Sequence, residues 1–135
     1  MDLGQSRRGV DMGPSALRSA GLQAAIKKLG ITVEDIGNME VKQPEEMSIG
    51  EKRAKYLQEI AETCADIAKT VDKSLQEDFL PLVLGGDHSI AAGVAAGVSN
   101  FYRQQKKDIG YIWLDAHGDM NIPESSPSGN VHGET

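Results

Sequence analysis

Two short apolar stretches, residues 79–84 and 109–114, constrain the fold of this chain more than any other feature. Both are shorter than an ordinary helix and end where glycine or a charged residue follows, so both are predicted to be buried β-strands. Apolar residues at helical spacing precede and separate them, at about 48–75 and 89–105. Helices that alternate with buried strands indicate a parallel sheet, so the predicted fold class is α/β.

Earlier in the chain, Pro14 is a good first helical residue, and the apolar positions up to Leu29 predict one amphipathic helix that Gly30 closes. A short strand is expected at residues 31–36. Residues 4–14 and the chain after Asp115 have no hydrophobic period and are expected to be loops. With 39% hydrophobic and 25% charged residues among 135, the composition is that of one globular domain.

The overall charge and the apolar content exclude several classes of partner. A net charge of −6 argues against a nucleic-acid-binding surface, which needs a basic patch. The longest apolar run, residues 90–98, is too short to cross a bilayer, and the first residues do not resemble a secretory signal. Cys64 is the single cysteine, so no intrachain disulfide is possible and its expected role is packing. The predicted location is the cytoplasm, with no membrane partner.

Three potential metal ligands follow the second apolar stretch. Asp115, His117 and Asp119 lie at positions i, i+2 and i+4, which an extended backbone directs to one side. Carboxylate oxygen and imidazole nitrogen, without thiolate, suit manganese, iron or zinc. The alternative is a capped turn with a surface histidine.

A second polar cluster, residues 85–89, follows the first apolar stretch and places His88 at a strand-to-helix turn. A parallel sheet would bring this turn beside Asp115, so that His88 supplies a further nitrogen ligand and Asp87 orients a ligand. In the alternative reading, Asp87 or Ser89 only caps the helix and His88 is exposed. The glycines do not match either common phosphate-binding pattern.

The third cluster is a loop restrained by proline and glycine, residues 121–133, which carries hydroxyls, amides and His132. Such groups can bind a carboxylate or an amine. Two nearby cations would lower the pKa of a bridging water, and His132 could donate the proton that a leaving amine needs. Ordinary turn chemistry is the alternative for this loop.

Taken together, residues 85–89, 115–121 and 126–133 resemble the arginase branch of the ureohydrolase family, and residues 1–14 resemble its early loop in the bacterial form. The resemblance implies a three-layer α/β/α fold with a mostly parallel sheet. It also implies that residues 1–135 are a single partial domain, which lacks the carboxyl-terminal part and the first strand. Family members continue with an Asp-x-Asp motif that completes the metal shells and a glutamate that grips the guanidinium.

The resemblance further implies a reaction and a set of ligands. His88 and Asp119 would bind one Mn²⁺, His117 the other, and Asp115 both. Hydroxide would attack the guanidinium carbon of L-arginine and give urea and L-ornithine, with His132 as the proton shuttle.

The residues implied to contact the amino-acid end of the substrate are Asn121, Ser128 and Asn130. They favour arginine over agmatine, which has no α-carboxylate, and Glu134 departs from the uncharged residue usual in the family. A homo-oligomer is implied for the full-length form. Agmatinase, formimidoylglutamase and a non-catalytic truncated chain remain the alternatives.

Overall fold

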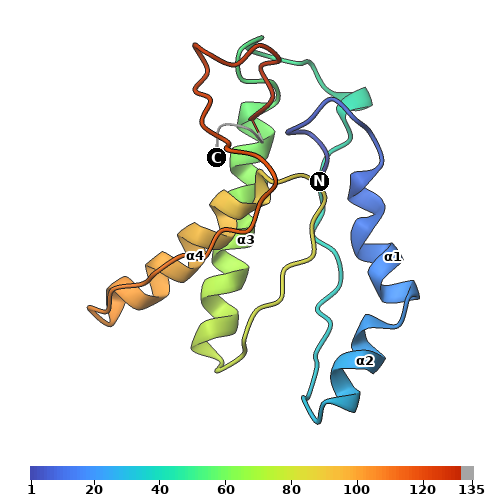
Figure 1. Cartoon of the computed structure of the whole chain (residues 1–135), viewed down its shortest axis with the longest axis vertical. Coiled ribbons are helices and arrows are strands. Elements are labelled where there is room, and N and C mark those ends of the chain that lie inside the picture. Colours follow the sequence, from blue (N-terminus) through green and yellow to red (C-terminus); the bar gives the residue numbers. More distant parts are fainter. Residues whose placement is uncertain (132–135) are drawn as a thin grey trace.

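The computed structural model describes residues 1–131 of the chain. In this part, helix α3 lies beside helix α4, and helices α1 and α2 follow one another along another side (Figure 1). The elements, in chain order, are η1 (Val10–Met12), α1 (Gly13–Ser19), α2 (Leu22–Lys28), η2 (Pro44–Glu46), α3 (Leu57–Gln76) and α4 (Ile90–Gln104).

The three predicted strands are extended chain without strand pairing. Within residues 1–131 no β-strand forms, and no backbone hydrogen bond joins any two of the three segments. Their apolar side chains face solvent, with Leu80 92% exposed, Ile112 91% and Leu114 90%. The predictions that residues 79–84 and 109–114 are buried strands and that residues 31–36 form a short strand are therefore wrong for this structure. The physical reason is that an extended segment becomes part of a sheet only when its backbone groups bond to a neighbouring strand, and these three segments do not bond to one another.

The helix predicted from Pro14 to Leu29 is two helices. Gly21 has a φ of 87°, in the left-handed region, and breaks the helix between α1 and α2. Glycine adopts this conformation without the steric cost that a Cβ would bring, so the chain can turn here. Helix α3 also begins later than predicted, at Leu57, because Tyr56 before it is left-handed with a φ of 54°. The helix predicted at about 89–105 is confirmed as α4.

The packing of α3 against α4 provides the main helical contact. Ile67 and Val71 of α3 are 5% and 2% exposed, and they face Gly93 and Gly97 of α4. A Cβ on Gly97 would lie 2.6 Å from the carbonyl oxygen of Ala68 and 2.8 Å from the Val71 Cβ. The two backbones are thus close enough that this position of α4 has no room for a side chain.

A second buried cluster joins the amino-terminal loop to the start of α3. Met1 and Leu3 pack with Ala54, Ile60 and Val131, and Leu3 is only 1% exposed. Cys64 packs against the same cluster and is half-buried, which agrees with its predicted role. The beginning of the chain is therefore part of the core.

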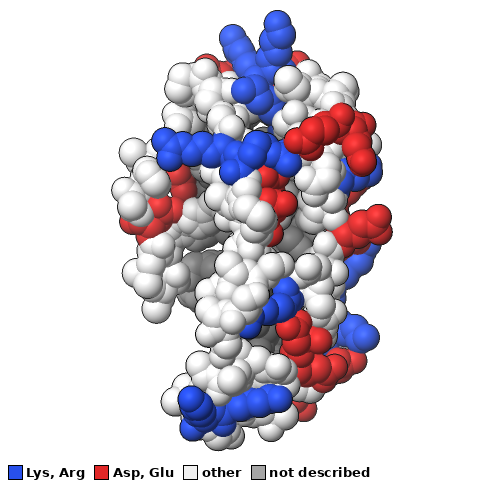
Figure 2. Space-filling view, turned by 90° about the vertical axis from the view of Figure 1, so that its right-hand side faces the viewer, with Lys and Arg blue, Asp and Glu red and all other residues white. Residues whose placement is uncertain are grey.

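The face of the molecule seen in Figure 2 carries charges of both signs, interspersed among uncharged residues. Among the ion pairs of the described residues, the Arg18 guanidinium donates to both carboxylate oxygens of Asp35, at 2.6 and 2.9 Å. This contact ties α1 to the extended segment after α2, and together with the Gly37 amide it lowers the pKa of Asp35 to about 2.

None of the helices in residues 1–131 is long and apolar enough to span a membrane.

Candidate metal centre

His88 and two aspartates, which are far apart in the sequence, converge on one point. His88 lies in the turn before α4, whereas Asp115 and Asp119 follow the extended segment 109–114. The His88 Nδ1 atom is 2.6 Å from the Asp115 Oδ2 and 3.5 Å from the Asp119 Oδ2. One ligand atom from each of the three lies within 4.8 Å of the others. The structure thus brings together three of the four predicted metal ligands.

The two carboxylate oxygens of Asp115 face different histidines. While Oδ2 faces His88, Oδ1 accepts a hydrogen bond from the His117 backbone amide at 2.8 Å and lies 3.2 Å from the His117 Nδ1. The His117 amide is the main reason that the pKa of Asp115 falls to about 2, with smaller contributions from the His117 ring, Asp119 and His88. Asp115 is therefore ionised at neutral pH, as a metal ligand must be.

Asp119 has a buried oxygen that the protein leaves unsatisfied. Its Oδ2 has no hydrogen-bond partner among the residues that the structure describes, although His88 lies within ion-pair distance. A buried carboxylate oxygen without a partner is costly, and a cation beside it would remove that cost. Together with the imidazole and the second carboxylate, it forms a donor set that fits Mn²⁺, Fe²⁺ or Zn²⁺.

His117 and Trp113 border this group in different ways. The His117 side chain is 81% exposed, and in the described part of the chain it is outside the compact group of three. The indole of Trp113 stacks on the His88 ring with a centroid distance of 4.6 Å and an angle of 17° between the planes. Trp113 was not among the predicted site residues, and its only signal in the sequence is its position two residues before Asp115.

The predicted substrate-binding residues border a cavity beside the metal group. Its volume is about 290 Å³. The residues that line it are His117, Gly118, Asp119, Asn121, Ser126, Pro127, Ser128 and Asn130. Asn130 is buried, and its side-chain amide donates to the Ser6 hydroxyl at 2.8 Å. His132, the predicted proton shuttle, lies outside the described residues.

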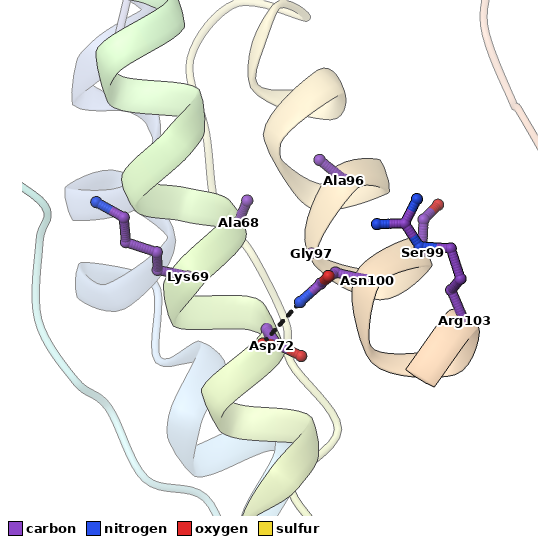
Figure 3. Close-up of a pocket in the computed structure, with 8 residues that line it drawn as sticks. All are labelled: Ala68, Lys69, Asp72, Ala96, Gly97, Ser99, Asn100 and Arg103. Atoms are coloured by element: carbon purple, nitrogen blue, oxygen red, sulfur yellow. Dashed lines mark hydrogen bonds between the residues drawn. The ribbon is translucent and has the colours of Figure 1, made fainter. Parts of the chain in front are cut away.

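Another hollow, of about 480 Å³, lies between α3 and α4 (Figure 3). The side-chain amide of Asn100 donates to the Asp72 Oδ2 at 3.0 Å across it. None of its lining residues belongs to the three polar clusters of the sequence. It is therefore separate from the candidate metal centre.

Comparison with protein families gives a match over the whole chain. The family model described as the arginase family matches residues 1–135. The arginase of Bacillus caldovelox is 48% identical over 134 residues, which are 98% of this chain and 44% of that protein. The arginase of Brevibacillus brevis is 49% identical over 133 residues, 98% of this chain and 43% of that protein.

Solved structures resemble the chain as well. The native structure of Bacillus caldovelox arginase at pH 5.6 matches with a TM-score of 0.89 and 48% identity, over 98% of this chain and 44% of that one. Entamoeba histolytica arginase in complex with L-ornithine matches with a TM-score of 0.73 and 31% identity, over 97% and 43%. This likeness supports the α/β class. The chain spans less than half the length of these relatives, and its description as one partial domain stays a prediction.

Proposed function

The chain belongs to the arginase family, and we propose that it carries part of a manganese-dependent site at which the whole protein hydrolyses L-arginine to L-ornithine and urea. The convergence of His88, Asp115 and Asp119 is the observation that carries the proposal. These three side chains come from two distant segments. The alternative, a capped turn with a surface histidine, gives no reason for them to lie together.

Four residues would hold the metal. In the proposal, His88 and Asp119 would bind one Mn²⁺, His117 would bind the second, and Asp115 would contribute to holding both. The opposed contacts of the Asp115 oxygens, one toward each histidine, support this division. When bound, the two ions supply a hydroxide nucleophile at neutral pH, because they lower the pKa of water.

The chain's own groups bind the substrate and move the proton. Water adds to the guanidinium carbon, the bond from that carbon to the ornithine nitrogen breaks, and urea and L-ornithine leave. His132 gives the departing amine its proton. Asn121, Ser128 and Asn130 hold the amino-acid end of arginine, and their place beside His117 and Asp119 in one cavity supports this role.

The wider biological context is proposed from the family alone. The full-length protein would be a cytoplasmic homo-oligomer. The solved relative with bound L-ornithine supports an amino-acid product. Agmatinase and formimidoylglutamase remain the alternatives within the family, and turnover of arginine, agmatine and formimidoylglutamate by the full-length protein would separate them.

The metal site is tested by titrating the 135-residue chain with Mn²⁺ in a calorimeter. Asp115→Ala should abolish binding, because Asp115 contacts both histidines. The matched control is Asp108→Ala, an exposed aspartate that precedes the same extended segment and should leave binding unchanged. Equal binding by the wild type and Asp115→Ala would contradict the proposed site, and no binding by either would show that the residues of this chain do not hold Mn²⁺ by themselves.

A further inference from the structure

Asp87, next to His88, is a buried carboxylate whose two oxygens bond to different parts of the chain. Asp87 as a whole is only 5% exposed. Oδ2 accepts the Gly4 amide at 3.0 Å, and Oδ1 accepts the Ser89 amide at 3.0 Å and also the Ser89 hydroxyl. Burial of a carboxylate is costly unless hydrogen-bond donors compensate its charge. Here the Gly4 amide, the Ser89 amide and the Ser89 hydroxyl do so.

The amino-terminal loop lies directly against the same turn. The Asp87 amide donates to the Met1 carbonyl at 3.0 Å. A Cβ on Gly4 would lie 2.7 Å from the Asp87 Oδ1, and a Cβ on Gly86 would collide with the Met1 carbonyl oxygen. Glycine at these two positions allows the loop and the turn to approach this closely.

Helix α3 holds the other side of the turn. The Cys64 thiol donates to the Ser89 carbonyl at 3.3 Å, and Ser89 is fully buried. The backbone on both sides of His88 is therefore held by hydrogen bonds, to the amino-terminal loop on one side and to α3 on the other. By contrast, the His88 ring itself contacts Trp113, Asp115 and Asp119, all on the chain segment after α4.

We propose that Asp87 is a positioning residue: its carboxylate joins the amino-terminal loop to the His88 turn and thereby sets where the His88 ring meets Asp115 and Asp119. The proposal rests on the proposed metal site. It goes beyond that site because it gives residues 1–4 a part in positioning the metal ligand His88. In this proposal, Asp87 acts through the position that it gives to His88.

The test replaces Asp87 by Asn in the 135-residue chain, which keeps the size and removes the charge. The matched control is Asp66→Asn, an exposed aspartate of α3 that is ion-paired with Lys69. Mn²⁺ affinity, measured by calorimetry, should fall about 10- to 100-fold in Asp87→Asn, as for other groups that orient a ligand. It should not change in the control.

A second measurement needs no metal. Trp113 stacks on His88, so the indole ring should shift the NMR signals of the His88 ring protons. In Asp87→Asn this shift should shrink, while the signals of α3 and α4 stay in place. Gly4→Ala keeps the carboxylate but pushes the loop away from it, and it should move the same His88 signals.

The outcomes separate the two proposals. If the His88 signals of both variants match the wild type, Asp87 does not position His88, whatever the metal affinity. Unchanged Mn²⁺ affinity in Asp87→Asn would overturn the inference as well. If the wild type binds no Mn²⁺, the residues of this chain do not hold the metal by themselves, and the NMR comparison still decides the role of Asp87.

Discussion

Two regions of the molecule are rich in apolar residues: the helix pair α3 and α4, and the extended segments 79–84 and 109–114. In the helix pair apolar side chains are buried, whereas in the extended segments they are exposed. Ile67 in α3 is 5% exposed, whereas Ile112 in the second segment is 91% exposed. A helix satisfies its backbone hydrogen bonds internally and needs a partner only for one face. An extended segment needs neighbours for its backbone as well, so the same hydrophobicity leads to burial in one region and to exposure in the other.

The candidate metal centre joins these two regions. His88 belongs to the packed region, where the amino-terminal loop and α3 hold its turn. Asp115 and Asp119 belong to the chain that follows an exposed segment. That segment is held to α4 through the Tyr111 hydroxyl, which donates to the Ala95 carbonyl and meets the Ser99 hydroxyl, both at 2.8 Å. One side of the site is thus anchored by buried groups and the other by a few exposed contacts.

The largest difference is expected between two isoleucine truncations. Ile67→Ala should lower the free energy of unfolding by about 2–5 kcal/mol, because it leaves a cavity between α3 and α4. Ile112→Ala should change it by less than about 0.5 kcal/mol, because its side chain is already in solvent. Urea denaturation followed by circular dichroism measures both. A comparable loss in Ile112→Ala would show that the exposed segment is packed in solution.

A glycine pair gives the next largest effect. Gly97→Ala should destabilise the chain by about 1–3 kcal/mol, since the added methyl group meets the Ala68 carbonyl and Val71. Gly110→Ala is the control, because a Cβ there meets nothing within 4 Å. The same denaturation experiment applies. If Gly97→Ala were stabilising, helix propensity would outweigh the close approach of α3 and α4, and the packed region would be looser than described.

The exposed segments should also promote self-association, because unpaired extended chain with apolar side chains is a template for pairing. Ile112→Lys is expected to raise the concentration at which the chain stays monomeric in light scattering. Leu29→Lys, which adds the same charge at a 75% exposed residue at the end of α2, should have less effect. Equal effects would indicate that charge alone, and not the extended segment, controls association.

The smallest expected effect is on the pKa of Asp35, in the extended segment that follows α2. Arg18 lowers the pKa of Asp35 from 3.8 to about 2, so the contact stabilises the folded state above pH 4 and is lost as the pH falls toward 2. NMR titration should give a midpoint near 2 for Asp35. Arg18→Ala should move this midpoint back toward 3.8, while Lys69→Ala should not. An Asp35 midpoint near 3.8 in the wild type would contradict the contact.

Local signals in the sequence predicted most of α3, all of α4 and the three residues that meet in the candidate metal group, while the roles of the site residues stay predictions. The apolar spacing in α3 and α4 was predictive because helical periodicity is local, and only the boundaries differed. Gly21 was missed as a break because glycine is tolerated inside a helix at modest cost, so only its left-handed φ of 87° reveals the turn. The polar residues at 85–89 and 115–119 marked the metal group because each cluster interrupts an apolar run.

The amino-acid sequence alone was therefore enough to predict α4, most of α3, the apolar stretches and the clusters of potential metal ligands, since each depends on neighbours along the chain. Tertiary structure decided whether the apolar stretches are buried. Here they are exposed, because an extended segment is buried in a sheet only when other strands pair with it and other elements cover it. It also decided the partners of Asp87, which are a loop at the start of the chain and Ser89. No local pattern could specify the bond to Gly4, because it joins residues 83 positions apart.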